Sequence, residues 1–303
     1  MRQMHEAGGR HEPIERSAGG QPSLRQLEVL VAVAEAGGFS AAAQRLGLQQ
    51  SSVSRAVREL ETVLDVRLFL RGPAGTQITA AGHRIIAGAR RLLALVDDLP
   101  DLARDRPAGG TVRIGAFRTA AVLLLPPVAA RLAAAHPTIT LQIRSLREID
   151  GGVGAAIAAG TCDVGLTSLP TDPELVSIAL TEDPYVRVEP ASDDHDLAEL
   201  PFLHWNESCS DRAIAWLTAS GTPPRRTLQA EDEQVVLALV GGGVGWSLMP
   251  AFAARPKPSD VRLRALKGSP TRTIGVCAHP AGLARPAVRA VFDAISESVI
   301  SPA

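Results

Sequence analysis

The chain has 303 residues, more than one ordinary hydrophobic core holds, which predicts two or three domains. Hydrophobic residues make up 46% and charged residues 21%, a globular balance that excludes a largely disordered chain. The net charge is −1, but residues 1–92 carry 12 arginines against 8 acidic residues, net +4, and the remainder is net −5. This asymmetry favours an anionic partner for the N-terminal part.

The cysteines and the first residues carry no sign of metal binding or export. Three scattered cysteines, without a CxxC pair or a histidine at metal-ligand spacing, predict neither a disulfide framework nor a zinc site. Residues 1–22 lack an apolar segment and are typical of a disordered tail. We therefore expect a cytoplasmic protein with no metal, no cofactor and no membrane span.

Helix signals begin directly after this tail. Ser23 followed by Gln26 is a capping-box pattern, and apolar residues then recur at helical spacing up to a Gly-Gly pair. Ser40 can cap a second helix over residues 41–46, which Gly47 ends in the left-handed conformation.

A third predicted helix, residues 50–64, separates apolar from polar side chains. Its apolar stripe consists of Val53, Val57, Leu60 and Leu64. The opposite side carries Ser51, Ser54, Arg55 and Arg58. Short hydroxyl side chains followed by arginines suit a helix in a DNA major groove, where guanidinium groups reach phosphates and guanine edges. The three helices predict a helix-turn-helix, although an arginine-bearing helix can also be a solvated surface.

Two strand-like pieces follow, residues 66–69 and 76–79, with a glycine-containing turn at 72–75. They predict a hairpin, or wing, with Arg71 at its base. A basic wing beside a recognition helix would contact the flanking DNA backbone.

The stretch from Leu24 to Gly82 resembles the winged helix-turn-helix of LysR-type transcriptional regulators. The resemblance rests on FSAAAQRLGLQQSSVSRAVRELETVLDVRLFLR and ITAAG. It implies that double-stranded DNA is bound by Ser40, Gln50, Ser51, Ser52, Ser54, Arg55, Arg58 and Arg71. Two positions depart from the family pattern: Gln49 replaces a Ser or Thr helix cap, and Asp65 stands where glycine is common.

A long helix is predicted after the wing, capped by Thr79 and ending near Pro100. Its apolar residues repeat with the 3.5-residue period of a coiled coil, namely Ile85, Ala89, Leu92, Val96 and Leu99. Two heptads are short for a coiled coil, so the helix could instead pack on its own domain. The resemblance favours pairing as a homodimer or homotetramer on a partly palindromic operator. Residues 101–110 are the predicted hinge.

Beyond the hinge, strand and helix patterns alternate in βαβαβ order, which predicts a parallel sheet covered by helices. A second α/β set begins near Ser177, and the chain returns with TIGVCAHP and a last helix. Two lobes joined in this way enclose a cleft at the carboxyl ends of the strands. The pieces IGAFRTAAVLLLP, HPTITL, AAGTCDVGL and LVGGGVGWSLMP resemble the LysR-type effector domain, itself similar to periplasmic solute-binding proteins.

The predicted cleft contains two arginines. Phe117, Arg118 and Thr119 form a strand-to-helix junction whose backbone N–H groups favour an anion. The resemblance adds further effector-binding positions, Arg147, Thr167, Ser168, Asn206, Glu207, Ser208 and Asp232. Arg118 and Arg147 favour a small carboxylate effector, unless both form salt bridges with acidic residues of this half.

Other patterns are weaker. Trp205 and Trp246 could line the cleft or belong to the core. The acidic run at 193–196 has metal-binding chemistry but is more typical of a solvated loop, and GGGVGW lacks the lysine of a phosphate loop. Ser247 does not stand in a nucleophile-elbow pattern.

These observations predict an α/β chain with an all-α-plus-wing N-terminal domain. The predicted boundaries are 1–22 for the tail, 23–79 for the winged helix-turn-helix, 80–110 for the linker helix and hinge, and 111–303 for a two-lobed, periplasmic-binding-protein-like effector domain, with lobe I at about 111–168 and 269–300 and lobe II at about 169–268. The predicted function is ligand-responsive, sequence-specific transcriptional regulation. An effector-independent architectural DNA-binding protein is the alternative, followed by an α/β enzyme with an appended helix-turn-helix.

Overall fold

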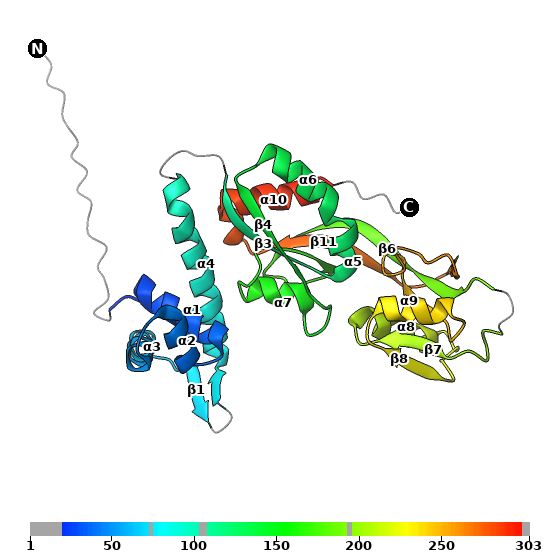
Figure 1. The fold of residues 1–303 in the computed structure, drawn as a ribbon, viewed down its shortest axis with the longest axis horizontal. Helices are drawn as coiled ribbons and strands as arrows, with labels where there is room; N and C mark the ends of the chain where they lie inside the picture. The colour runs from blue at the N-terminus through cyan, green and yellow to red at the C-terminus, as the bar shows by residue number, and fades with distance from the viewer. Residues whose placement is uncertain (1–19, 73–74, 103–107, 193–195, 299–303) are drawn as a thin grey trace, which may run out of the picture. The chain divides into compact units, whose positions relative to one another are not determined.

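The computed structural model describes residues 20–72, 75–102, 108–192 and 196–298. The chain forms two compact units that divide inside one helix, between Ala89 and Arg90. Figure 1 shows a helical N-terminal unit with a small hairpin and a C-terminal unit built around a mixed sheet. Most of the predicted N-terminal tail, residues 1–19, lies outside the described residues.

The N-terminal unit contains three helices, a hairpin and the start of a fourth helix: α1 (Leu24–Ala36), α2 (Phe39–Leu46), α3 (Gln50–Leu64), β1 (Phe69–Gly72), β2 (Gly75–Ile78) and α4 (Ala80–Leu102). Helices α1, α2 and α3 contact one another around fully buried Leu30, Val53 and Leu60. The apolar stripe predicted for α3 therefore forms the centre of this unit.

The predicted caps of α1 and α4 are confirmed. The backbone N–H of Ser23 donates to the Gln26 side chain at 2.9 Å, and the backbone N–H of Gln26 donates to Ser23 Oγ at 3.2 Å. The Gly82 N–H donates to Thr79 Oγ1 at 2.8 Å at the start of α4. Gln49 precedes α3 without a side-chain capping bond, and Asp65 ends α3 in the left-handed conformation at φ 49°.

The predicted start of α2 was wrong by two residues. The helix begins at Phe39 after an extended Gly38, so Ser40 lies inside the first turn and is not the cap. Phe39 is buried, and its ring packs edge-on against the Phe69 ring with 5.5 Å between centroids. This aromatic contact fixes the start of the helix where the sequence offers no side-chain cap.

The first wing strand lies three residues later than predicted, over Phe69–Gly72 instead of residues 66–69. The buried carboxylate of Glu61 on α3 accepts the N–H groups of Leu68 at 2.7 Å and Phe69 at 3.3 Å. Residues 66–68 are therefore tied to α3 and are not paired with β2. Pairing with β2 runs from Phe69 to Gly72.

The C-terminal unit holds the end of α4 and the following elements: β3 (Gly110–Ala116), α5 (Arg118–Leu123), α6 (Leu125–Ala135), β4 (Ile139–Ser145), α7 (Gly152–Ala158), β5 (Val164–Leu169), β6 (Val176–Pro190), β7 (Phe202–Trp205), α8 (Ser208–Ala219), β8 (Thr227–Ala230), α9 (Glu233–Gly241), β9 (Ser247–Pro250), β10 (Val261–Ala265), β11 (Thr271–Ala278), a 3-10 turn (Gly282–Ala284) and α10 (Pro286–Ser296). The helical stretch between β3 and β4 is two helices, since Pro126 and Pro127 stand in the first turn of α6.

The main sheet has the strand order β10-β6-β11-β5-β3-β4, and β9 pairs with β6. Strand β3 pairs in parallel with β4 and β5, which confirms the βαβαβ prediction, whereas β11 runs antiparallel to β5 and β6. Strands β7 and β8 form a separate parallel pair. The fifteen residues of β6 pair with β11 along one part and with β9 and β10 along another. Strands β6 and β11 thus connect lobe I, which contains β3 to β5, with lobe II, which contains β7 to β10.

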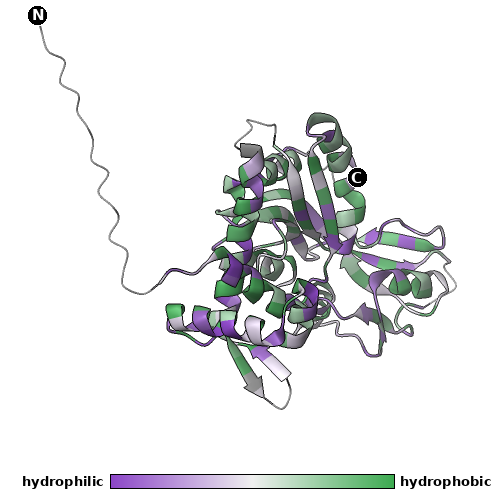
Figure 2. Cartoon of the chain, turned by 60° about the vertical axis from the view of Figure 1, so that its left-hand side comes forward, coloured by the Kyte–Doolittle hydropathy of each residue, from purple (hydrophilic) through white to green (hydrophobic). Residues whose placement is uncertain are grey.

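Helices cover both faces of the sheet in lobe I. Helices α6 and α10 pack together on one face, and α7 contacts β3 and β5 on the other (Figure 1). A separate buried cluster in lobe II surrounds Tyr185, Trp205 and Leu248. Hydrophobic and hydrophilic residues alternate along the helices in Figure 2, as expected for helices with one buried face. Among the described residues, no single helix is long and apolar enough to cross a membrane.

The last turns of α4 pack on lobe I of the same chain. The buried guanidinium group of Arg285 pairs with Asp98 on α4 at 2.7 Å and with Asp163 at 3.2 Å. Arg90 and Arg91 donate to the carbonyl oxygens of Ala159 and Ala158 at the end of α7. Cations at a helix C-terminus interact favourably with its dipole, so this end of α4 belongs to the C-terminal unit.

Candidate functional sites

Helix α3 presents a polar face to solvent. Five of the predicted DNA-binding residues are exposed on this helix: Gln50, Ser51, Ser52, Arg55 and Arg58. The Arg55 side chain is 74% exposed, and its ion pair with Glu59 spans 3.9 Å on the same helix. Its guanidinium group is available to a partner because an exposed pair of this length holds it weakly.

Ser54 and Arg71 were also predicted to belong to this DNA-binding surface. Ser54 is 9% exposed, which contradicts its placement on the solvent side. At 100° per residue, Ser54 follows Val53 and precedes Val57 by one turn, so it lies at the edge of the buried stripe. Arg71 is part of β1, but its side chain lies outside the described part of the chain.

The coiled-coil seam predicted on α4 is divided between exposed and buried residues. Leu92 and Leu99 are 50% and 56% exposed, as a surface that pairs with another chain requires. Ala89 is 2% exposed within its own chain, so it is not available to a partner. The two leucines are one heptad apart and, with the partly exposed Ile85 and Val96, form the apolar surface that remains.

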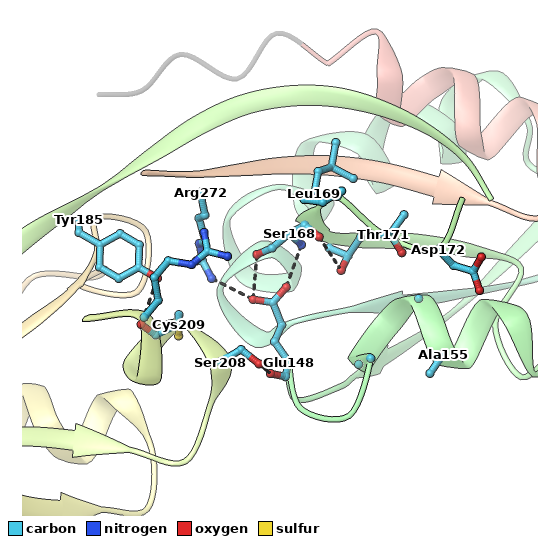
Figure 3. A pocket seen from close by; sticks show the side chains of 16 residues that line it. Glu148, Ala155, Ser168, Leu169, Thr171, Asp172, Tyr185, Ser208, Cys209 and Arg272 are labelled. Carbon is cyan, nitrogen blue, oxygen red and sulfur yellow. Dashed lines mark hydrogen bonds and ion pairs between the residues drawn. The ribbon is translucent and has the colours of Figure 1, made fainter. Parts of the chain in front are cut away.

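A cavity of about 450 Å³ lies where the two lobes meet, within the size range of small-ligand sites. It is lined by the start of α7, the end of β5 and the loop after it, the first turn of α8, and single residues of β6 and β11. Thr167, Ser168 and Ser208 of the predicted effector site line this cavity. Figure 3 shows Ser168 and Glu148 at its centre, with Arg272 and Tyr185 to one side.

Arg272 on β11 is the most buried charge of the cavity wall, with 4% of its side chain exposed. Its Nε donates to Asp183 at 2.9 Å, and its Nη1 donates to Glu148 at 3.0 Å. The guanidinium carbon lies 4.6 Å from the centre of the Phe117 ring, which is a cation–π distance. Arg272 and Asp183 are also cross-strand partners of β11 and β6, so this ion pair lies on the connection between the lobes.

Glu148 is held by several donors at once. Its carboxylate accepts the Ser168 N–H at 2.8 Å and the Ser168 hydroxyl at 3.0 Å, in addition to Arg272. The carbonyl oxygen of Glu148 accepts the Ser208 hydroxyl and the Ser208 N–H from lobe II. Glu148 therefore links three parts of the cavity wall.

The two arginines predicted to bind an anion are already paired with carboxylates. Arg118 forms an ion pair with Glu233, which is 7% exposed at the start of α9. Arg147 lies 3.8 Å from Glu207 and donates to the Asn206 carbonyl at 2.6 Å. Arg118 therefore forms the predicted alternative, a salt bridge with an acidic residue of this half, whereas the long ion pair of the half-exposed Arg147 holds its guanidinium group only weakly.

Comparisons with known proteins agree with this architecture. Residues 105–299 match the family model described as the LysR substrate binding domain, and residues 24–83 match the bacterial regulatory helix-turn-helix protein, lysR family. The chain belongs to the LysR family. Among curated relatives of this LysR-type transcriptional regulator, the probable regulator LrrA of Synechococcus elongatus is 31% identical over 91% of the chain and 97% of its own length. IlvR of Caulobacter vibrioides is 30% identical over 84% and 90%.

Solved structures of LysR-type regulators share the fold. Full-length OxyR from Pseudomonas aeruginosa superposes with a TM-score of 0.68 at 23% identity, covering 92% of this chain and 96% of that one. CbnR in complex with its target DNA gives a TM-score of 0.57 at 26% identity, covering 90% and 99%. The relatives are transcriptional regulators, which excludes the enzyme alternative.

Several other predicted residues of this LysR-type regulator have structural roles. Asp232 caps α9 by accepting the N–H groups of Gln234 and Val235. Thr119 is buried, and Trp205 lies in the lobe II core with Trp246 packed against it, which settles the choice between cleft and core. The Ser247 hydroxyl is buried and donates to the Leu203 carbonyl at 2.8 Å.

Three acidic groups near the cavity, Cys209, Glu207 and Asp183, have raised pKa values. Burial raises the pKa of the Cys209 thiol to about 12, so it is not a reactive thiolate at neutral pH. Burial, followed by the nearby Glu233 carboxylate, raises the pKa of Glu207. Burial also raises the pKa of Asp183 despite the attraction of Arg272. Among the described residues, no group of His, Cys, Asp or Glu could hold a metal ion, and residues 193–195 of the acidic run lie outside them.

Sequence reasoning missed Arg272, Asp183, Glu148 and Tyr185. Arg272 lies in β11 and Asp183 in β6, and a charge within a strand signals a buried ion pair only when its partner is known. Glu148 directly follows a predicted residue, Arg147, and its carboxylate could have been included on that ground.

Proposed function

We propose that this regulator reads a specific operator with the exposed face of α3, and that a small molecule in the interlobe cavity controls this activity. The observation that carries the DNA part is the division of α3 into a buried apolar stripe and an exposed face with Gln50, Ser51, Ser52, Arg55 and Arg58. Short polar side chains in the first turn allow close approach to base edges, and arginines one and two turns later reach guanine or phosphate. The DNA complex of CbnR, 26% identical, supports a DNA partner.

The proposed assembly is a homodimer or homotetramer that acts in the cytoplasm. Leu92 and Leu99 on α4 supply the apolar surface for pairing between copies. Two reading helices related by a two-fold axis would bind two half-sites about one helical turn, or a multiple, apart, so the operator would be partly palindromic.

The test is operator binding by the full chain, with an operator first selected from random duplexes. We expect Arg55→Ala to weaken binding to the selected operator by about 1–3 kcal/mol and to relax preference at one base position. Arg25→Ala, an exposed arginine on α1 paired with Glu28, is the matched control and should bind normally. The unmutated protein should prefer the selected operator over random duplex by roughly a thousandfold or more.

A shallow preference at the same salt concentration would support the architectural alternative. An equal loss on all sequences would make Arg55 a phosphate contact. No loss in Arg55→Ala, or the same loss in Arg25→Ala, would contradict the proposed reading face.

A further inference from the structure

The cavity wall contains one buried hydrogen-bond donor that the described protein leaves unused. Arg272 has five N–H groups, of which Nε and Nη1 donate to Asp183 and Glu148. Its Nη2 is buried and has no hydrogen-bond partner among the described residues. A buried donor without a partner is unfavourable, so a ligand atom that accepts from Nη2 would remove this cost.

The position of this donor is fixed before any ligand arrives. Two carboxylates and the Phe117 ring hold the guanidinium group, and Figure 3 shows it beside Tyr185 with the Glu148 carboxylate in front of it. A rigid donor of this kind binds an acceptor without paying for side-chain ordering.

The charge around Arg272 decides which acceptor fits. One guanidinium group faces two carboxylates, and both interactions are short and buried. An anionic ligand at Nη2 would add a third negative charge beside Asp183 and Glu148, in a place where water screens little. An uncharged oxygen accepts the same hydrogen bond without this repulsion.

The other cations of the cleft do not change this balance. Arg118, which forms an ion pair with Glu233, and the half-exposed Arg147 do not line the cavity. Arg212 lines the cavity but is exposed, and a solvated arginine attracts an anion only weakly.

We propose that the effector is an uncharged molecule that presents a carbonyl or amide oxygen to Nη2 of Arg272, and that the Asp183–Arg272–Glu148 arrangement selects it against carboxylates. This inference rests on the proposed function, in which the cavity binds a small effector. It places recognition on β11, one of the two strands that connect the lobes, where a bound ligand contacts Arg272 and its partner Glu148.

The experiment uses a pair of probes of nearly equal shape, trifluoroacetamide and trifluoroacetate, with the full chain at neutral pH. Binding is followed by ¹⁹F line broadening, and crystals soaked in each probe locate it. We expect trifluoroacetamide to occupy the cavity with its oxygen on Nη2 and to bind about tenfold or more tightly than trifluoroacetate. Preference for trifluoroacetate at Nη2, or no binding of either probe at this position, would overturn the proposal.

Three variants sharpen the comparison. Arg272→Lys keeps a cation for both carboxylates but removes Nη2, and should lose about tenfold in affinity for the amide. Glu148→Gln keeps an acceptor for Ser168 while removing one negative charge, so trifluoroacetate should gain affinity relative to the amide. Arg212→Gln is the matched control at the same cavity and should leave the preference unchanged; abolished binding there would place an anion site at the exposed arginine instead.

Melting temperature and operator binding are measured on the same preparations. If Arg272→Lys does not fold, the Glu148→Gln comparison decides the question alone. Failure of the proposed function would appear as absent operator preference in the unmutated protein, whereas failure of this inference would leave operator binding intact and reverse or remove the probe preference.

Discussion

The carboxylate of Glu61 should hold the wing of the DNA-binding unit in place, and its removal should be costly. Glu61 is 8% exposed, and one of its oxygens accepts the N–H groups of Leu68 and Phe69. Its other oxygen lies 3.2 Å from Arg67, whose side chain is 75% exposed. The two backbone hydrogen bonds are therefore the important contacts, since an ion pair with a solvated arginine contributes at most about 1 kcal/mol.

The expected magnitudes differ between two substitutions. Glu61→Ala leaves both N–H groups without their acceptor, at about 1–3 kcal/mol for each buried group, so we expect a loss of about 2–6 kcal/mol. Glu61→Gln keeps one oxygen as an acceptor and loses only the weak ion pair, at about 1 kcal/mol or less. For a domain of this size, each kcal/mol lowers the melting temperature by about 4–8 °C.

Two measurements check this reasoning in the full chain. Calorimetry should show a transition for the N-terminal unit that falls by roughly 10 °C or more in Glu61→Ala and by only a few degrees in Glu61→Gln. Hydrogen exchange should show lost protection at the Leu68 and Phe69 amides in the alanine variant alone. Equal effects of the two substitutions, or amides that stay protected in Glu61→Ala, would refute the proposed role of the carboxylate.

Three further substitutions test packing and electrostatics. Gly165→Ala would bring a Cβ within 2.5 Å of Val153 Cγ1 and 2.9 Å of Cys277 Sγ. A urea titration should therefore show that the free energy of unfolding falls by about 1–3 kcal/mol. An unchanged midpoint would mean that the neighbouring side chains move aside without cost. Gly88→Ala is its counterpart in α4, where no described atom lies within 4 Å of the added methyl group. This substitution should stabilise the helix by about 0.5–1 kcal/mol. A loss of stability would indicate that another copy of the chain approaches α4 at this position. Burial and neighbouring carboxylates raise the pKa of Glu207 above its ordinary 4.5. The folded chain therefore binds this proton more tightly than the unfolded chain does. As a result, the free energy of unfolding falls as the pH rises from the ordinary pKa to the raised pKa. Glu207→Gln should remove that part of the fall, and its melting temperature should gain on the parent as pH increases through this window; a pH-independent difference would contradict the assignment.

Local sequence determined the helices of the N-terminal unit to within two residues. The helix ends are set by local contacts, made by Ser23 with Gln26, by Thr79 and by Gly47. Because these contacts lie within a few residues of each cap, they can be predicted from the sequence without knowledge of the fold. The helical spacing of apolar residues on α3 likewise distinguished Val53, which is buried in the core of the N-terminal unit, from the exposed Arg55. The same holds for the parallel order of β3, β4 and β5, which follows from strict alternation of strands and helices.

Only the tertiary structure decided which charges of the C-terminal unit remain available. Arg118 has the sequence position of an anion-binding residue, yet Glu233, more than a hundred residues later, is its partner. Arg272 has no motif around it, yet the pairing of β11 with β6 places it against Asp183 and beside the cavity. Local sequence cannot show these pairs because they depend on which strands become neighbours, and that is set by the burial of the whole apolar sheet. The sequence alone therefore determined the family and the exposed polar face of α3, while the pairing of charges around the interlobe cavity depends on long-range contacts that exist only in the folded chain.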